Sequence, residues 1–380
     1  MSSLGAYIHL PWCVRKCPYC DFNSHTAPKQ LPEDPYIDAL LGDLEFDLPK
    51  VWGRTVSTVF IGGGTPSLFG GDAINRLMEG LRSRLRCAPD MEVTMECNPG
   101  TAEYAPFADY RKAGINRLSL GAQSFDDESL QQLGRIHRAS ETLQAFAKAR
   151  DAGFDNINLD IMYGLPQQSH EGALHDLRTA ISLEPEHVSW YQLTLEPNTL
   201  FAANPPNLPD DEALWAMQAE GQAMLAAAGF MQYEVSAYAR ERRQCRHNMN
   251  YWSFGDYLGL GAGAHAKLTQ VGVVERTVRQ RQPKAYLQAQ PEQRVVQRTE
   301  PDAAELRFEF MLNAARLTDG FSMQRFTAST GLAAAALEPE LSELRSKGLF
   351  EPAADGRVVP TELGRRFVDE ITAAFLPESS

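Results

Sequence analysis

The feature that most limits the possible folds of this 380-residue chain is a regular alternation of strand-like and helix-like segments over its first two-thirds. Each short β-branched segment is followed by a stretch with helical spacing of apolar residues, as at Leu77, Leu81 and Leu85. The expected strands cover 6–10, 58–61, 92–96, 117–120, 156–162 and 188–195, and 233–238 is a candidate seventh. Such alternation predicts a parallel sheet with right-handed crossovers.

An open doubly wound sheet and a partial barrel both satisfy this alternation. Polar residues, however, recur at the carboxyl ends of the expected strands, and a barrel gathers these ends at one mouth, where active sites lie. The residues are Cys13, the segment 62–65, Glu96, Gln123, Asp160, Thr194 and Glu196. We therefore expect an α/β fold with a partial (β/α)6 barrel of the TIM type.

The last third of the chain follows a different pattern. Helices are predicted near 301–317, 322–329 and 337–347, followed by a hairpin over 349–360 that turns at Asp355 and Gly356, and by a last helix that ends at Phe375. Three helices and a hairpin are typical of a winged-helix-like module. The expected parts are a core over 1–238, a loop-rich, locally basic connection over 239–300, and a smaller, mainly helical C-terminal domain over 301–380 that serves as a lid or docking domain.

Charge and hydropathy restrict the partners and the location of the protein. The chain has 36 Lys and Arg residues against 49 Asp and Glu, a formal net charge of −13 that argues against broad binding of nucleic acid. No apolar run reaches the ~20 residues of a membrane helix, and the N-terminus carries no recognisable secretory signal. We expect a cytoplasmic protein that is not itself transmembrane.

The cysteines point to a metal centre. Cys13, Cys17 and Cys20 are crowded together, whereas the other three cysteines of the six are scattered. A disulfide framework suits small secreted chains, so crowded thiols in a reducing compartment favour metal ligation. An iron–sulfur cube normally takes one thiolate per iron, and three cysteines in a C-x3-C-x2-C spacing leave one iron open to an exogenous group.

Zinc is the alternative metal, but a structural zinc site needs four protein ligands. Cys245 and His247 could complete such a site, although they lie far along the chain.

The C-x3-C-x2-C motif after the first strand and Gly62-Gly63-Gly64-Thr65-Pro66 after the second together resemble the radical S-adenosylmethionine (SAM) superfamily. The stretch YIHLPWCVRKCPYCDFNSH over 7–25 is similar to the oxygen-independent coproporphyrinogen III oxidase branch. Within that branch the resemblance is greatest to the HemW family of haem chaperones and covers essentially the whole chain. The resemblance implies a [4Fe–4S] cluster held by Cys13, Cys17 and Cys20, with SAM on the open iron.

The same resemblance implies a set of SAM contacts at successive strand ends. The set is Tyr7, Tyr19, Gly63, Gly64, Thr65, Glu96, Gln123, Arg135 and Asp160. Bare backbone at the glycines would approach the methionine amino group, and Tyr19 would contact the adenine. Taken singly, Arg135 also fits a surface charge, Asp160 a capping carboxylate and Gln123 a loop hydrogen-bonder. Their shared location at strand ends favours the SAM interpretation.

Two features separate the sequence from the oxidases that it resembles. Those enzymes have a further cysteine two residues beyond the triad, where this chain has Phe22, and an extension ahead of the first strand, at which this chain almost begins. The expected function is therefore a haem chaperone that passes haem to an acceptor protein. The alternative is a radical SAM enzyme that decarboxylates coproporphyrinogen III or acts on a similar tetrapyrrole. No catalytic residue is assigned.

The string H-N-x-x-Y-W, which begins at His247, is typical of the HemW family and is associated there with haem binding. A neutral imidazole is a good axial iron ligand, so His247 is the predicted haem contact and Cys245 the competing one. The alternative is a structural role for His247, as a buried, hydrogen-bonded histidine in an aromatic cluster. The nearby residues Arg240, Arg242, Arg243 and Arg246 could pair with haem propionates. The implied partners are haem and a haem-acceptor protein, for which a membrane-associated protein is one option.

The remaining features have local interpretations. The segment Gly259-Leu-Gly261-Ala-Gly263, with His265 beside it, is an incomplete dinucleotide fingerprint and is interpreted as close backbone packing near the site. His9, His25 and His137 are expected to be local hydrogen-bonding groups. Cys87 and Cys97 are expected to be small buried apolar residues.

Overall fold

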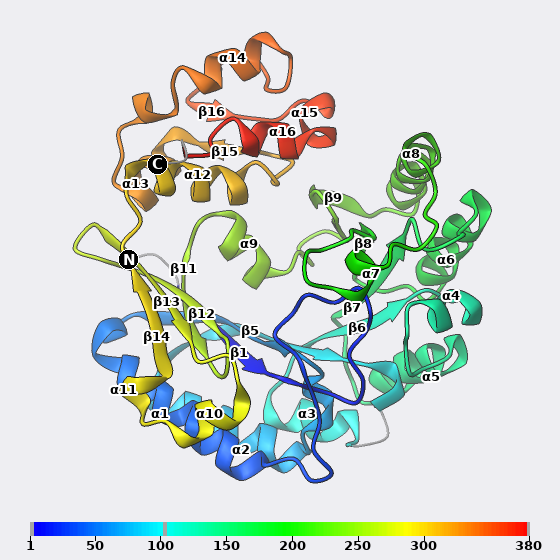
Figure 1. The fold of residues 1–380 in the computed structure, drawn as a ribbon, viewed down its shortest axis with the longest axis vertical. Helices are drawn as coiled ribbons and strands as arrows, with labels where there is room; N and C mark the ends of the chain where they lie inside the picture. The colour runs from blue at the N-terminus through cyan, green and yellow to red at the C-terminus, as the bar shows by residue number, and fades with distance from the viewer. Residues whose placement is uncertain (1–3, 102–104, 378–380) are drawn as a thin grey trace.

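In the computed structural model, which describes residues 4–101 and 105–377, the first part of the chain forms a strongly curved sheet with helices on its outer face (Figure 1). Six parallel strands lie side by side in chain order. They are β1 (Leu4–Leu10), β4 (Thr55–Gly63), β5 (Arg86–Cys97), β6 (Arg117–Gln123), β7 (Ile157–Tyr163) and β8 (His187–Gln192). The predicted partial (β/α)6 barrel is confirmed, and each of the six expected strands is present.

Helices cover the convex face of this sheet because alternate side chains of each strand point outward. In β1, Leu4, Ala6 and Ile8 are fully buried in the core beneath the helices, whereas Tyr7 and His9 point into the barrel. The covering helices are α1 (Glu33–Val51), α2 (Gly71–Arg84), α3 (Phe107–Ala113), α4 (Asp127–Gln132), α5 (Ala139–Asp151), α6 (His170–Ser182) and α8 (Asp211–Ala227). The short helix α7 (Leu200–Ala203) instead packs against Pro18 and Tyr19. Single 3-10 turns η1 (Pro66–Leu68) and η2 (Pro99–Thr101) follow β4 and β5.

The expectation of a loop-rich connection over 239–300 is wrong. This segment extends the sheet beyond β1, first with β11 (Asp256–Leu260), which pairs in parallel with β1, and then with three antiparallel strands. These are β12 (His265–Gln270), β13 (Val273–Arg279) and β14 (Val295–Thr299), accompanied by α9 (Arg246–Trp252), α10 (Pro283–Gln288) and α11 (Pro291–Arg294). The register of β11 depends on pairing with a strand that is some 250 residues away in the sequence, so local patterning does not reveal it.

The candidate seventh strand over 233–238 is also different from expectation. It is split into β9 (Met231–Glu234) and β10 (Ala237–Ala239), which form a small antiparallel hairpin on the free edge of β8. The complete sheet therefore has antiparallel additions at both ends of the six parallel strands.

The two largest of the four apolar clusters among the described residues lie in different parts of the chain. The larger cluster joins the barrel strands and their helices, and it includes Leu258, Leu260 and Tyr286 from the 239–300 extension. The smaller cluster lies in the C-terminal helices and also takes in Phe254 and Val274. The division at 238 and 300 stays a prediction, and the outermost residues of the predicted parts, 1–3 and 378–380, lie outside the described residues.

The C-terminal part is mainly helical, as predicted. Its elements are α12 (Ala303–Ala314), β15 (Phe321–Ser322), α13 (Met323–Thr330), the 3-10 turn η3 (Ala334–Leu337), α14 (Glu340–Ser346), β16 (Arg357–Val358), α15 (Glu362–Arg366) and α16 (Val368–Ala373). The predicted turn is present, with positive φ at Asp355 and Gly356, but β16 pairs with β15 and the hairpin itself is reduced to isolated bridges. The single last helix of the prediction is interrupted at Phe367.

No helix in the described part of the chain combines the length and the apolar composition that a membrane span requires.

A buried ionic cluster joins the extension to the barrel. The carboxylate of Asp43 on α1, which is 0% exposed, lies 3.2 Å from Arg279 Nε and 3.1 Å from Arg294 Nη1. It also accepts hydrogen bonds from the Tyr286 hydroxyl and the Gly261 amide. Both guanidinium groups come from the 239–300 segment, so this one carboxylate links α1 to elements more than 200 positions later in the sequence.

We expect Asp43→Ala to lower the free energy of unfolding by about 3–5 kcal/mol, because the change leaves the buried Arg294 guanidinium without a carboxylate and Arg279 with Asp47 alone. Urea unfolding followed by circular dichroism measures the loss. Glu45→Ala in the same helix is the matched control, since the Glu45 side chain is 56% exposed in its ion pair with Arg84 and is worth less than about 1 kcal/mol. Equal losses in the two variants would contradict the structural role of Asp43.

Candidate functional site

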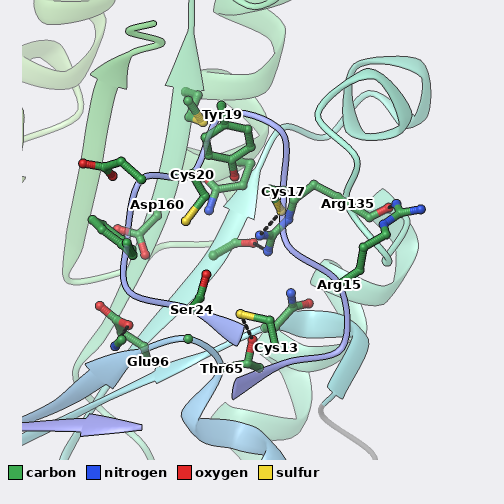
Figure 2. A pocket seen from close by; sticks show the side chains of 18 of the residues that line it. Cys13, Arg15, Cys17, Tyr19, Cys20, Ser24, Thr65, Glu96, Arg135 and Asp160 are labelled. Atoms are coloured by element: carbon green, nitrogen blue, oxygen red, sulfur yellow. Dashed lines mark hydrogen bonds between the residues drawn. The ribbon is translucent and has the colours of Figure 1, made fainter. Parts of the chain in front are cut away.

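The three crowded cysteines face one cavity at the carboxyl ends of the barrel strands. Cys13 ends the short strand β2 (Trp12–Cys13), which pairs with β3 (His25–Thr26), and the loop between them carries Cys17 and Cys20. All three thiols line a cavity of about 570 Å³ and are free of disulfides. Figure 2 shows their sulfur atoms around the same space.

The glycine-rich turn after β4 lets the cysteine segment approach closely. The amides of Gly64 and Thr65 donate to the carbonyls of Leu10 and Trp12 at 2.8 and 2.7 Å. A Cβ atom at Gly64 would lie 2.6 Å from the Trp12 carbonyl oxygen, and Gly63 has a φ of +117°. The glycines are therefore required by packing of the chain against itself, in addition to any role toward a ligand.

The Thr65 hydroxyl donates to Cys13 Sγ at 3.4 Å, which fixes one thiol relative to the glycine turn. On the other side of the cavity, Arg135 Nη1 donates to Cys17 Sγ at 3.8 Å, and Arg135 Nη2 donates to the Gly121 carbonyl at 2.8 Å. The arginine thus holds the cysteine loop against the end of β6, and the prediction of a mere surface charge does not fit it.

Buried carboxylates line the inner wall of the cavity. Glu96 on β5 accepts a hydrogen bond from the Gly63 amide at 3.1 Å, and Asp160 on β7 accepts from Ser119 and Asn158, each at 2.8 Å. Burial raises the pKa of Glu96 to about 7, and the neighbouring charge of Asp160 acts in the same direction. Burial also raises the pKa of Asp160, against the effect of its hydrogen bonds. The Glu96 carboxylate can therefore take up a proton near neutral pH.

Most of the predicted cofactor residues are brought together here. The first cavity is lined by Cys13, Cys17, Cys20, Tyr19, Gly63, Gly64, Thr65, Glu96, Gln123, Arg135 and Asp160. Two predicted residues are not among its lining: Tyr7 and His247.

Sequence reasoning missed Tyr191 of β8, whose hydroxyl donates to Gln123 Oε1 at 2.7 Å. The available signal was the inward position of Tyr191 in the period-2 pattern of β8.

A second cavity of about 690 Å³ lies inside the barrel. In a closed barrel this space is filled by layers of branched side chains, but here inward positions carry small and polar groups such as Thr94, Ser119 and Ser189. Its lining also includes the aromatic side chains of Tyr7, Phe60, Tyr251, Trp252 and Tyr257. The two cavities share a wall formed by Asp21, Phe22, Gly63, Glu96, Ser119 and Asp160.

Helix α9, which carries the H-N-x-x-Y-W string, lies over the opening between the barrel and the C-terminal helices (Figure 1). His247 is fully buried, with Nδ1 2.9 Å from the Thr58 hydroxyl and Nε2 2.9 Å from the Tyr251 hydroxyl, and its ring stacks on Phe60. His247 does not line the second cavity, whereas Tyr251 and Trp252 do. The imidazole therefore supports the aromatic wall in this structure.

Cys245, the competing haem ligand of the prediction, is buried and belongs to the lining of the second cavity. Its thiol donates to Glu92 Oε1 at 3.8 Å, and burial raises the pKa of this thiol to about 11. Ligation of a metal ion would require this buried thiol to lose its proton and its hydrogen bond to Glu92.

The four arginines near the string do not line either cavity. Arg243 and Arg246 face Asp155 and Asp90, Arg240 stacks on Phe230, and Arg242 lies beside Glu241 at the surface. The expected pairing of these arginines with propionates is therefore not supported by their positions. The arginines that line the second cavity are Arg117 and Arg281, and neither lies in the local sequence of the string.

The local interpretations of the other residues are largely confirmed. His9 lies between the Tyr7 hydroxyl and the Asn23 carbonyl, and His25 and His137 also contact nearby oxygen atoms. A Cβ at Gly261 would lie 2.4 Å from the His9 carbonyl oxygen, which confirms close backbone packing at the glycine-rich segment. Cys97 is buried, and Cys87 is half-buried against the same core.

The cysteine loop fits an iron–sulfur cluster. Within residues 4–101 and 105–377, no group of three His, Cys, Asp or Glu side chains converges as a single metal ion would require. The three thiols instead surround one side of a cavity, as ligands to different irons of a cube do. The glycine turn and the carboxylates leave space beside them for a small polar cofactor.

Comparison with known families matches residues 7–180 to the radical SAM superfamily and residues 302–367 to the HemN C-terminal domain. The chain is 49% identical over 379 residues to the protein named heme chaperone HemW of Escherichia coli strain K12, with 100% of this chain and 99% of the relative covered. It is 35% identical to the HemW of Bacillus subtilis strain 168, with 98% and 99% covered.

Among solved structures, coproporphyrinogen III oxidase (HemN) from Escherichia coli aligns with a TM-score of 0.81 over 98% of this chain and 90% of that chain. The sequence identity in this alignment is 24%, so the likeness concerns the fold.

We expect Cys17→Ser to abolish assembly of the cluster, because one iron loses its thiolate. Iron and acid-labile sulfide, measured after anaerobic reconstitution, fall from about four of each per chain toward zero. Cys87→Ser is the matched control, since Cys87 lies outside the cavity. Full iron and sulfide content in the Cys17 variant would contradict the assignment.

The raised pKa of Glu96 predicts a pH dependence of SAM binding. If the carboxylate accepts from the SAM ammonium group, binding requires the ionised form, which is lost as the pH falls through about 7. Affinity then decreases about tenfold from pH 8 to pH 6. Equilibrium dialysis on the cluster-loaded chain measures this, with Glu96→Gln giving weaker and pH-independent binding. A wild-type affinity that is constant over this range argues against the contact.

Proposed function

This chain belongs to the HemW family of radical SAM proteins, and on that premise we propose that it is a haem chaperone, which binds haem and transfers it to an acceptor protein. The proposed acceptor is membrane-associated and the proposed location is the cytoplasm.

As a radical SAM protein, the chain works with a [4Fe–4S] cluster and SAM. We propose that Cys13, Cys17 and Cys20 hold the cluster and that the other residues of the first cavity hold SAM. When bound, these groups supply one-electron chemistry. The Thr65 and Arg135 hydrogen bonds keep the thiols in place, and the buried Glu96 carboxylate accepts from the cationic part of SAM.

The observation that carries the proposal is the aromatic second cavity that adjoins the first. Tyr251 and Trp252 of the H-N-x-x-Y-W string belong to its wall, together with Tyr7 and Phe60. A flat apolar macrocycle buries its faces against such rings, and arginines in the wall suit carboxylates at its edge. The cavity volume of about 690 Å³ is within the range of cofactor sites.

The predicted contacts of Tyr7 with SAM and of His247 with haem remain proposals. Tyr7 lies in the second cavity, with its hydroxyl 2.9 Å from His9 Nδ1, so it would approach SAM only across the shared wall. His247 would reach haem only after its hydrogen bond to Tyr251 is broken.

The shared wall also favours a second candidate function, a radical SAM enzyme acting on a tetrapyrrole. A substrate in the second cavity would lie next to Glu96 and Asp160, which also line the cofactor cavity. Phe22 occupies the rim where the oxidases that the sequence resembles have a further cysteine, and it is 60% exposed. We therefore rank haem transfer above oxidative decarboxylation.

Transfer is distinguished from passive release by its dependence on acceptor concentration. We expect the cluster-loaded, haem-loaded chain to deliver haem to haem-depleted membrane vesicles at a rate that rises in proportion to vesicle concentration. Simple dissociation gives a rate that is independent of the vesicles. Absorbance of the vesicle cytochromes measures delivery, and an equal amount of haem on serum albumin is the control.

A rate that does not change with vesicle concentration would overturn the chaperone proposal. Incubation with coproporphyrinogen III, SAM and a reductant tests the second candidate, since formation of vinyl groups would identify the chain as an oxidase.

A further inference from the structure

His265 is the histidine of the second cavity whose side chain is left without a partner. The other two imidazoles in the cavity wall, those of His9 and His187, have both ring nitrogens at hydrogen-bond distance from a protein atom. His265 is exposed at the rim and has no hydrogen bond, ion pair or ring contact among the described residues.

Neighbouring residues hold His265 at this rim. It is the first residue of β12, and β12 approaches β11 so closely that a Cβ at Gly259 would lie 1.8 Å from the His265 carbonyl oxygen. The Asn23 amide donates to the carbonyls of Ala262 and Arg281, each at 2.9 Å. The rim is therefore fixed to the loop that carries the cysteines, although the imidazole itself is free.

Arg281 completes this rim with a free cation. Its carbonyl accepts the Asn23 hydrogen bond, but its guanidinium group contacts no carboxylate within ion-pair distance in the described part of the chain. A carboxylate ligand at this position would gain a charge-assisted hydrogen bond without breaking an existing ion pair.

Resting on the proposed haem-binding function, we propose that His265 is the axial ligand of the haem iron and that Arg281 pairs with a haem propionate. The macrocycle then lies in the second cavity against Tyr251, Trp252 and Tyr257. The His265 imidazole can coordinate the iron without losing a hydrogen bond. His247 would have to give up its hydrogen bonds to Thr58 and Tyr251, and Cys245 its hydrogen bond to Glu92.

Ligation and packing are separated by comparing haem with iron-free protoporphyrin IX. The cluster-loaded chain is titrated anaerobically with each pigment, and difference spectra are recorded against the same protein without pigment. We expect His265→Gly to lose the low-spin Soret band and to bind haem at least about tenfold more weakly, with binding of protoporphyrin IX unchanged. Added imidazole restores the band, which a purely structural role would not allow.

Arg281→Ala should weaken haem and protoporphyrin IX alike, by about tenfold, since both carry propionates. His175→Ala is the matched control, because His175 is an exposed histidine outside the second cavity. Unfolding midpoints equal to that of the wild type show that the exposed changes leave the fold intact.

The possible failures are distinct. A wild-type chain that binds no haem would overturn the proposed function itself. Wild-type haem binding with an unchanged Soret band in His265→Gly would overturn only the ligand assignment, and loss of the band in His247→Ala or Cys245→Ser would then identify the ligand. Loss of both haem and protoporphyrin IX binding in His265→Gly would assign the residue to the wall.

Discussion

The arrangement of this protein depends on a barrel that does not close. Six parallel strands leave their inward-facing side chains without the opposite wall that a complete barrel provides. Helix α9 covers part of this opening. The His247 ring is hydrogen-bonded to the Thr58 hydroxyl, and the backbone amide of His247 donates to Glu92. These contacts satisfy Thr58 and Glu92, whereas the Thr94 hydroxyl has no hydrogen-bond partner among the described residues. The space that remains is a cavity inside the barrel.

The same constraint explains why two cavities adjoin. The carboxyl ends of β4, β5 and β7 bring Gly63, Glu96 and Asp160 between the cysteine loop and the barrel interior. One side of this wall faces the thiols and the other faces the aromatic rings of α9 and β1. A group bound in the interior therefore lies close to the cofactor cavity. At its rim, Asn23 joins the cysteine loop to the segments that follow β11 and β13.

The order of the six strands and the location of the cysteine cavity could be predicted from local sequence, because both follow from periodicity and from residues that are close together in the chain. The glycine turn was also recognisable, although its packing against Trp12 was not. By contrast, the extension over 256–299 was mistaken for loops. Only β11 pairs with β1, and that pairing is non-local; β12 and β13 form a local hairpin whose polar and basic composition was a misleading signal.

The sequence by itself determined the fold class, the cysteine triad, the strand-end carboxylates and the resemblance to haem chaperones. Only the tertiary structure decided which side chains face which space. In the H-N-x-x-Y-W string, Tyr251 lines the second cavity and His247 lies behind it, while His265 of β12 and Arg281, two residues after β13, lie at the rim. The physical reason is that side-chain direction and hydrogen bonding depend on contacts such as Thr58 with His247, which join residues 189 positions apart.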